Sequence, residues 1–409
     1  MSGTAGKGGP WLSVVGIGED GLAGLSAEAC RRLDAAEVIV GGRRHLALVP
    51  PSRAFRVVWT APILQAVRDL ARYRGRPTVV LASGDPLWYG VGRLVLRVFA
   101  REEVALIPHL SSFQLACARL GWPLEETVTT TVHGRPVARL RRAYAPGARI
   151  LALTDGEEGP ARIAAMLCAD GYADARVHVL AHLGGPREAH WSGTAQEARD
   201  GRFAELNLVG LELPDDPARP PPPRTPGLPE ALFAHDGTLT KAEVRAAALA
   251  ALAPRPGELL WDVGAGCGSV AVEWLRITPR GRAVAVERDP GRAALIRRNA
   301  ERLGVPELVV IEGGAPAALP AEPAPDAVFV GGGLTTPGLL ETCAERLRPG
   351  GRLVAHAVTA EGEARLLAFL EARGGELVRQ TVSRITGVGG RRLWRSLAPV
   401  TRLLWVRPP

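Results

Sequence analysis

One stretch decides the fold of the second half of this chain: Glu258-Leu259-Leu260-Trp261-Asp262-Val263-Gly264-Ala265-Gly266-Cys267-Gly268-Ser269-Val270. It begins as an apolar run that ends beside an acidic residue, which is typical of a buried parallel strand. Three glycines at alternate positions follow, and the apolar spacing over residues 270–275 then predicts a helix. A glycine turn at this place lets a ligand approach the backbone, and the first amides of the helix are free to bind it.

A second strand is predicted over residues 282–286, and it ends at Glu287. A carboxylate about 20 residues beyond a glycine turn can accept hydrogen bonds from the hydroxyls of a ribose. The sequence therefore predicts a site for an adenosine-containing cofactor. A dinucleotide fingerprint requires a further glycine where Ser269 stands, which argues against NAD.

The rest of this half narrows the choice of cofactor. A strand over residues 326–330 opens into Gly331-Gly332-Gly333, and Pro349-Gly350-Gly351 precedes another strand. This order resembles the class I S-adenosylmethionine-dependent methyltransferases, which have a Rossmann-like sheet. Gly314 stands where that family often has aspartate, so adenine is expected to meet backbone groups and Ala315. The resemblance implies that the cofactor contacts Thr240, Gly264, Ala265, Gly266, Cys267, Gly268, Glu287, Gly314 and Ala315.

The length and composition indicate a two-domain protein, because 409 residues with 46% hydrophobic content can form two sizeable cores. No apolar run approaches the about 20 residues that span a membrane, and residues 1–10 lack the apolar segment of a signal peptide. We therefore expect a cytoplasmic protein. The five cysteines lie far apart, which predicts reduced thiols with neither a metal site nor disulfides: Cys30, Cys117, Cys168, Cys267 and Cys343.

The net charge of +8 is compatible with two kinds of partner. Nucleic acid is one, but no basic block interleaves with aromatic residues, which make up 5% of the chain. A small substrate with many carboxylates is the other, because the arginine fork pairs with carboxylate at two points. Lys7 and Lys241 are the only lysines, so arginine supplies nearly all of the positive charge.

The first half also begins with a strand and a glycine-rich turn, over residues 11–18. Glu19 and Asp20 crowd that turn where a pyrophosphate would lie, which again argues against a dinucleotide. Helices are predicted over 27–35 and 63–73, and Ser111 or Ser112 is expected to cap another. Further strands are predicted over 38–40, 78–82 and 104–107.

Several segments of this half resemble the tetrapyrrole methylases, the class III S-adenosylmethionine-dependent methyltransferases: 14–21, 83–92, 108–113, 151–154 and 184–188. His133-Gly134-Arg135 fits the branch of that family that acts late in corrin assembly. Taken alone, Asp85 could equally be a turn residue that bonds its own backbone. The resemblance implies that the early turn does not hold the cofactor and that Gly84, Asp85, Pro86, Ser111, Ser112 and Thr154 do.

A proline-rich stretch over residues 214–229 separates the two halves and predicts an extended linker. The predicted domains are therefore 1–213 and 230–409, both of the α/β class. Behind the linker, Thr240 and Glu243 have the spacing of a capping box at the start of a helix.

The fusion of the two halves resembles the bifunctional methyltransferases of cobalamin biosynthesis. This resemblance implies that residues 1–213 methylate C5 of a precorrin-6 intermediate, while residues 230–409 methylate C15 and decarboxylate the ring C acetate, giving precorrin-8X. It also implies two S-adenosylmethionine sites per chain, a homo-oligomer, and no nucleic-acid or membrane partner. His235 or Lys241 would handle a proton, although such residues more often lie on a surface or at a helix end.

Two other functions compete with this interpretation. A nucleic-acid methyltransferase would be favoured by an Asn/Asp-Pro-Pro-aromatic motif after the fourth strand, where residues 331–334 read Gly-Gly-Gly-Leu. A non-catalytic nucleotide-binding or NAD-dependent protein is the other. Two S-adenosylhomocysteine sites per chain without NAD affinity would distinguish the methyltransferase from it.

Overall fold

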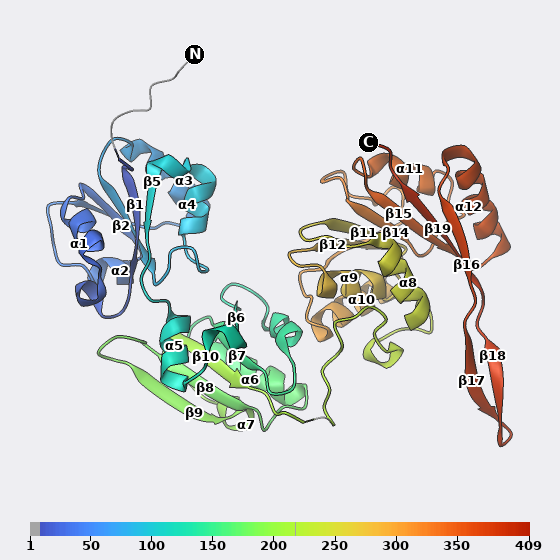
Figure 1. The fold of residues 1–409 in the computed structure, drawn as a ribbon, viewed down its shortest axis with the longest axis horizontal. Helices are drawn as coiled ribbons and strands as arrows, with labels where there is room; N and C mark the ends of the chain where they lie inside the picture. The colour runs from blue at the N-terminus through green and yellow to red at the C-terminus, as the bar shows by residue number, and fades with distance from the viewer. Residues whose placement is uncertain (1–8, 217) are drawn as a thin grey trace, which may run out of the picture. The chain divides into compact units, whose positions relative to one another are not determined.

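The computed structural model describes residues 9–216 and 218–409 (Figure 1). Residues 1–8, which include Lys7 and most of the segment considered above as a signal peptide, and residue 217 of the predicted linker lie outside the described residues. The chain divides into two compact units. Unit 1 consists of residues up to 137 together with 145–218, and unit 2 consists of residues 138–144 together with 219–409. In the described residues, no helix combines the length and the hydropathy needed to cross a bilayer.

The first sheet of unit 1 is parallel and has the order β3-β2-β4-β1-β5. Alternate residues of β1 face opposite cores, Val14 with α3 and α4, and Val15 with α1 and α2. The predicted helix over 63–73 is in fact α3 followed by a 3₁₀ helix, Asp69–Tyr73. The strands are β1 (Leu12–Ile17), β2 (Val38–Gly41), β3 (Phe55–Val58), β4 (Thr78–Ser83) and β5 (Val104–Ile107), and the helices are α1 (Ala27–Asp34), α2 (Arg43–Ala47), α3 (Ile63–Arg68) and α4 (Gly92–Val98).

The second sheet of unit 1 is mixed and has the order β6-β7-β10-β8-β9. Strands β6 and β7 are parallel, and β10 runs antiparallel to both β7 and β8, so β6, β7 and β8 end at the same edge. Helix α5 (Ser112–Leu120) packs on this sheet through Phe113 and Cys117. The other elements are β6 (Thr127–Thr131), β7 (Arg149–Leu153), β8 (Arg176–Ala181), β9 (Ala189–Thr194), β10 (Asn207–Glu212), α6 (Gly159–Ala169) and α7 (Ala195–Ala198).

The described residues of the proline-rich stretch, 214–216 and 218–229, form neither helix nor strand. Helix α8 (Ala242–Leu252) follows, and its N-cap is Lys241, whose side chain makes no capping bond. The predicted capping box of Thr240 and Glu243 is therefore wrong. The helix begins one residue later than expected, and Thr240 instead offers its carbonyl oxygen to the guanidinium of Arg245.

Unit 2 contains a seven-stranded sheet with the order β13-β12-β11-β14-β15-β19-β16, in which β19 runs antiparallel to its neighbours (Figure 1). Helices α8, α9 and α10 pack on one face, and α11 and α12 pack on the other. The predicted α/β class is thus confirmed for both halves. The strands are β11 (Leu259–Val263), β12 (Arg282–Glu287), β13 (Val309–Glu312), β14 (Ala327–Val330), β15 (Arg352–Ala357), β16 (Glu376–Gln380) and β19 (Val400–Val406), and the helices are α9 (Ser269–Ile277), α10 (Pro290–Arg302), α11 (Leu339–Arg346) and α12 (Ala360–Arg373).

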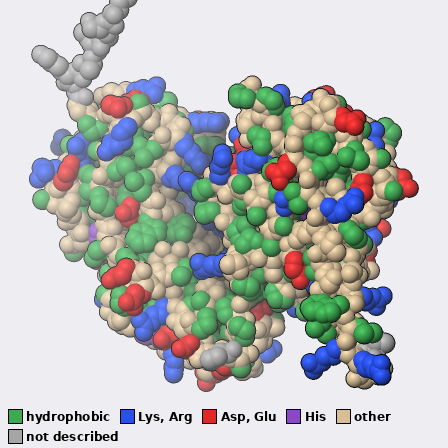
Figure 2. Space-filling model, turned by 45° about the vertical axis from the view of Figure 1, so that its right-hand side comes forward, with side chains coloured by type: hydrophobic (Ala, Val, Ile, Leu, Met, Phe, Trp, Pro, Cys, Tyr) green, Lys and Arg blue, Asp and Glu red, His purple; other side chains and the backbone are tan. Residues whose placement is uncertain are grey.

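A hairpin of β17 (Ser383–Val388) and β18 (Arg391–Ser396) extends from the end of β16 in Figure 1. Figure 2 shows arginine and hydrophobic side chains gathered on it. Trp394 is 72% exposed on this hairpin.

Candidate functional site

The glycine turn of unit 2 connects β11 to α9, as the sequence predicts. Gly264 has a φ of +66°, and a Cβ added there would lie 2.7 Å from the carbonyl oxygen of Gly332. Gly268 is the N-cap of α9 with a φ of +76°, and its added Cβ would lie 2.7 Å from Ile296. Both positions therefore require glycine. The strand order reverses between β11 and β14, which is where α/β sheets bind ligands.

Glu287 lies at the carboxyl end of β12 and is 4% exposed. Its Oε2 accepts a hydrogen bond from the Gly266 amide at 2.8 Å, and its carbonyl oxygen accepts one from the Gly313 amide at 2.9 Å. A Cβ added to Gly314 would meet no atom within 4 Å, so the space beside it is open. The structure thus brings the predicted residues 264–268, Glu287 and 314–315 to one edge of the sheet. Of these, Cys267 offers only its backbone, because its side chain is buried in the core.

Asp262 lies directly beneath this turn and is 1% exposed. Its Oδ2 accepts a hydrogen bond from the Ala271 amide in the first turn of α9 at 3.0 Å, whereas its Oδ1 has no hydrogen-bond partner. Burial, together with the nearby Glu287, raises the pKa of the Asp262 carboxyl to about 7. The sequence analysis assigned Asp262 no role, although an acidic residue inside an apolar strand was the available signal.

A buried ion pair holds the segment that leads into this site. Arg245 and Glu273 are 0% and 1% exposed, and the Arg245 Nε lies 2.5 Å from the Glu273 Oε1. The remaining guanidinium nitrogens donate to the carbonyl oxygens of Thr240 and Leu228, while the Leu228 amide donates to Glu273 at 2.9 Å. Residues 228–241, here called the covering segment, are thereby fixed at both ends. Sequence analysis missed both members of the pair.

Asn299 joins the covering segment to the glycine turn. It is fully buried, and its Oδ1 accepts a hydrogen bond from the Ala234 amide at 2.8 Å. Its Nδ2 donates to the carbonyl oxygens of Ala234 and Cys267, both at 2.9 Å. The carbonyl oxygen of Thr238 lies 3.7 Å from where a Cβ on Gly266 would be, so the segment passes close to the turn.

The two predicted catalytic residues lie at different points of the covering segment. His235 is exposed, and its Nδ1 accepts a hydrogen bond from the Gly237 amide at 3.0 Å. The Nζ of Lys241 lies 3.1 Å from the Oε2 of Glu230, whose other oxygen contacts Arg384 at 2.8 Å. Burial alone would raise the pKa of Glu230, but Lys241 and Arg384 lower it below its usual value. Lys241 is therefore held in an ion pair.

His356 on β15 is 9% exposed and packs edge-on against Phe329, with 5.0 Å between the ring centroids. Burial and the nearby Arg402 lower the pKa of His356 to about 4. The ring is therefore neutral at neutral pH and acts as a core side chain.

In unit 1 the predicted cofactor residues 84–86 and 111–112 lie around the end of β4, whereas Thr154 follows β7. Gly84 has a φ of +53°, and its added Cβ would lie 2.8 Å from the Cα of Ser111, so the two predicted segments touch. Asp85 Oδ1 accepts a hydrogen bond from the Leu87 amide at 2.7 Å, which is the turn geometry left open above. The Pro86 carbonyl oxygen accepts one from the Gly92 amide at 2.9 Å, which closes the loop.

Ser111 and Ser112 occupy different positions at the start of α5. Ser111, one of the two caps that the sequence predicts, is the N-cap and forms a capping box with Gln114, while Ser112 is the first helical residue. Thr154 follows β7, is 7% exposed, and its hydroxyl bonds to the side chain of Asn207.

Glu19 in the early turn of unit 1 is bonded to side chains from α2 and from the end of β8. Glu19 bonds to Arg44, and its Oε2 lies 3.2 Å from the Nδ1 of His182. Arg44 also donates to Ser83 Oγ at 2.8 Å, which in turn lies 2.8 Å from the Nε2 of His45. Burial opposes ionisation of Glu19, yet His182 and Arg44 lower its pKa below the usual range. Sequence analysis missed this network.

The Glu19–His182 bond also connects the two sheets of unit 1, because Glu19 follows β1 and His182 follows β8. A second connection is the hydroxyl of Tyr89, which donates to the Thr129 carbonyl oxygen at 3.3 Å. The carboxyl edges of the two sheets therefore meet around the loop that carries Gly84.

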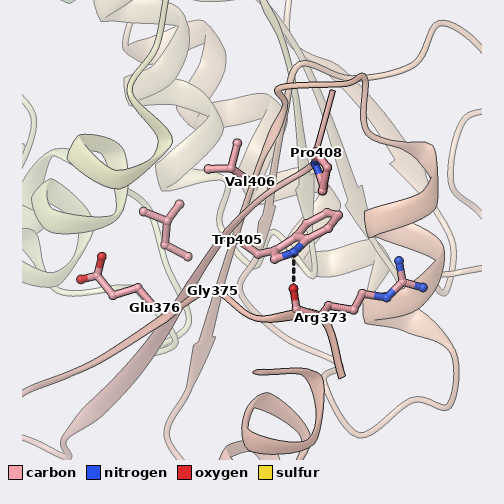
Figure 3. Close-up of a pocket in the computed structure, with 7 residues that line it drawn as sticks. Arg373, Gly375, Glu376, Trp405, Val406 and Pro408 are labelled. Carbon is pink, nitrogen blue, oxygen red and sulfur yellow. Dashed lines mark hydrogen bonds between the residues drawn. The ribbon is translucent and has the colours of Figure 1, made fainter. Parts of the chain in front are cut away.

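A separate pocket of about 350 Å³ lies on unit 2 (Figure 3). Trp405 pairs with Leu353 near the start of β15, so the pocket is at the sheet edge opposite the glycine turn. The indole of Trp405 donates to the Arg373 carbonyl oxygen at 3.1 Å, as the dashed line in Figure 3 shows. This pocket does not belong to the candidate cofactor site. It is lined by Arg373, Gly375, Glu376, Leu404, Trp405, Val406 and Pro408.

Both halves of the chain are similar to known proteins. Residues 12–199 match the family of tetrapyrrole (corrin/porphyrin) methylases, and residues 231–407 match the family described as a precorrin methyltransferase domain. A cobalt-precorrin-7 C(5)-methyltransferase of Salmonella typhimurium is 36% identical over 39% of this chain and 79% of its own. A probable cobalt-precorrin-6B C(15)-methyltransferase (decarboxylating) of Pyrobaculum calidifontis is 42% identical over 42% of this chain and 90% of its own.

A third relative spans both halves. The precorrin-6Y C(5,15)-methyltransferase [decarboxylating] of a Sinorhizobium species is 44% identical to this chain over 97% of each protein. The chain therefore belongs to the family of the precorrin-6Y C5,15-methyltransferases (decarboxylating).

Proposed function

We infer that the chain methylates C5 and C15 of a precorrin-6 intermediate and decarboxylates its ring C acetate, giving precorrin-8X. Residues 1–213 would serve C5, and residues 230–409 would serve C15 and the decarboxylation, joined by the linker at 214–229. The observation that carries this proposal is the presence of two separate glycine-built turns, one after β4 and one after β11, each at the carboxyl end of a strand with parallel neighbours. The single-function relatives named above support two separable activities.

The residues of both turns fit S-adenosylmethionine. In unit 2, glycines that tolerate no Cβ lie beside a buried carboxylate and open space at Gly314. In unit 1, Gly84 and Ser111 are in contact at the start of α5. S-adenosylmethionine, bound once in each domain, supplies an electrophilic methyl group. Residues 84–86, 111–112 and 154 would hold it in unit 1, and residues 240, 264–268, 287 and 314–315 would hold it in unit 2.

The protein's own contribution is mainly alignment. A positively charged methyl donor needs little acid–base help, so holding the substrate carbon in line with the methyl group provides most of the rate. The net charge of +8, carried almost wholly by arginine, suits a substrate with many carboxylates.

Decarboxylation also needs a proton. The bond from the side-chain carbon to the carboxylate breaks, carbon dioxide leaves, the electron pair enters the conjugated ring, and the remaining carbon takes up a proton to become a methyl group. His235 or Lys241 would supply that proton. His235 is exposed and its Nδ1 accepts a hydrogen bond from the Gly237 amide, whereas the ammonium of Lys241 is held by Glu230.

The test uses the full chain and calorimetric titration with S-adenosylhomocysteine. The unchanged chain is expected to bind two equivalents, while Gly84→Ala and Gly264→Ala each bind one, because the added Cβ collides with the neighbouring backbone. Mass spectrometry of the product should show loss of the C5 methyl in Gly84→Ala and of the C15 methyl in Gly264→Ala.

Gly387→Ala is the matched control, because its added Cβ would meet no atom within 4 Å. It should retain both equivalents and both methyl groups. A single equivalent in the unchanged chain, or loss of both methyl groups in either site variant, would contradict the proposed division of labour.

A further inference from the structure

A histidine–aspartate pair lies at the carboxyl edge of the second sheet of unit 1, outside the residues assigned above. The Nδ1 of His133 is 2.6 Å from the Oδ1 of Asp155. The Gly134 amide donates to both carboxylate oxygens, at 2.9 and 3.0 Å, and Arg162 lies 3.9 Å from Oδ2. The carboxylate of Asp155 is thus fixed by the backbone next to the ring that it contacts.

The fold places this pair beside the candidate cofactor residues of unit 1. His133 follows β6 and Asp155 follows β7, and these strands are parallel, so both residues lie at one edge. The Nδ1 of His133 is 3.3 Å from the carbonyl oxygen of Thr154, a residue proposed to hold the cofactor. The same edge meets the first sheet through the Glu19–His182 and Tyr89–Thr129 bonds.

The exposure and orientation of the ring suit it to proton transfer. The His133 side chain is 75% exposed, whereas its partner Asp155 is 36% exposed. An aspartate that accepts a hydrogen bond from Nδ1–H leaves the lone pair on Nε2, which is the arrangement of a general base. Three other histidines of unit 1 near the loop that carries Gly84 are engaged: His45 bonds to Ser83, His109 contacts the Leu110 carbonyl oxygen, and His182 bonds to Glu19.

We propose that His133 is the general base of the methylation carried out by unit 1, and that Asp155 is its positioning residue. The inference rests on the proposed function. It applies to a bridging carbon of the macrocycle that carries one hydrogen. The new carbon–carbon bond to the methyl group would use an electron pair of the conjugated ring, which becomes cationic, while the methyl–sulfur bond of the donor breaks and S-adenosylhomocysteine leaves with the electron pair of that bond. The Nε2 of His133 then takes the proton from that carbon, the C–H electron pair returns to the ring, and conjugation is restored.

The first test replaces His133 in the full chain. His133→Asn is expected to slow C5 methylation in a single turnover by about 10²- to 10⁴-fold, which is the usual contribution of a general base. Two readouts should stay unchanged: the affinity of unit 1 for S-adenosylhomocysteine, and the rate of C15 methylation by the same chain. His190→Asn is the matched control, because His190 is also exposed on this sheet but bonds to His178 instead.

A second variant separates loss of the base from loss of structure. Added imidazole should restore C5 methylation to His133→Ala, and the acid limb of the pH–rate profile should disappear from that variant and return with the imidazole. Asp155→Asn should slow the same step without rescue by imidazole. Nitrogen NMR of the His133 ring in that variant should show a change of tautomer, which does not depend on turnover.

The outcomes distinguish this inference from the function on which it rests. If the unchanged chain adds no methyl group at C5, the proposed function fails. If the unchanged chain is active and His133→Asn methylates C5 at the same rate, the inference is overturned. Failure of imidazole to rescue a His133→Ala chain that still binds S-adenosylhomocysteine in unit 1 would also overturn it.

Discussion

In each unit a glycine turn follows the first strand, β1 in unit 1 and β11 in unit 2, yet the surroundings of the two turns differ. The turn after β1 is closed, because Glu19 in that turn is bonded to Arg44 and His182. The turn after β11 leads directly into α9, lies above the buried carboxyl of Asp262, and borders the open space beside Gly314. The local pattern of glycines therefore does not decide whether a turn receives a ligand. The side chains that neighbouring strands and helices place around it do.

The largest expected effect comes from breaking the support of the unit 2 turn. Arg245→Met leaves Glu273 as an uncompensated buried charge, which typically costs about 3–5 kcal/mol. Hydrogen exchange should become faster in residues 228–241 and in the glycine turn, while unit 1 stays protected. The double variant Arg245→Met/Glu273→Leu should recover much of the stability, since no unpaired charge remains. Equal protection in the single variant and the unchanged chain would show that the pair does not hold the segment.

Asp262→Asn tests whether a buried acid beneath the turn makes unit 2 sensitive to pH. The pKa of Asp262 is raised from 3.8 to about 7, so its contribution to stability is complete below pH 3.8 and is lost as the pH rises through 7. Asparagine keeps an acceptor for the Ala271 amide but cannot ionise. The urea midpoint of unit 2 should therefore fall between pH 5 and pH 8 in the unchanged chain by more than it does in Asp262→Asn.

The control for this measurement is Asp200→Asn in unit 1, where the carboxyl is 82% exposed. It should leave the pH dependence of unit 2 as it was. If the urea midpoint of unit 2 changed with pH by the same amount in Asp262→Asn and in the unchanged chain, a buried neutral carboxyl at this position would be contradicted.

Glu19→Gln tests the corresponding feature of unit 1, with the opposite sign. The pKa of Glu19 is lowered, so its contribution is present above its ordinary value of 4.5 and is lost as the pH falls through the lower folded value. Removing the charge should destabilise unit 1 by about 1–2 kcal/mol at pH 7, through the lost bonds to Arg44 and His182. Thermal unfolding should show a smaller difference in stability between Glu19→Gln and the unchanged chain at pH 4 than at pH 7. A constant difference would contradict the charged interaction.

The smallest effect compares the two predicted helix caps. Ser111→Ala should destabilise unit 1 by about 1 kcal/mol, because Ser111 caps α5. Thr240→Ala should cost less than about 0.5 kcal/mol, because the Thr240 side chain does not cap α8 and its carbonyl group remains. Denaturant midpoints of the two variants measure the difference. Equal losses would mean that Thr240 contributes through its hydroxyl after all.

The sequence predicted well those elements whose signal is local. The strand, glycine turn and helix around Gly264 were found because apolar periodicity and glycine spacing lie within 20 residues of one another. The second sheet of unit 1 was missed, because none of its five strands was predicted as a strand, and residues 151–154, at the end of β7, served only as part of a family resemblance. Arg245 and Asn299 were missed for a different reason. Their partners lie 28 and 65 residues away, and only the folded chain brings these groups together.

Asn299 has one further consequence for unit 2. A single side-chain amide serves both Ala234 and Cys267, which are separated from it by 65 and 32 residues. A motion that moves Ala234 away from Asn299 breaks hydrogen bonds of this buried side-chain amide. Each buried polar group left without a partner costs about 1–3 kcal/mol. Displacing the covering segment near Ala234 is therefore expected to weaken the support of the glycine turn at Cys267. We expect these two parts of the site to become ordered together.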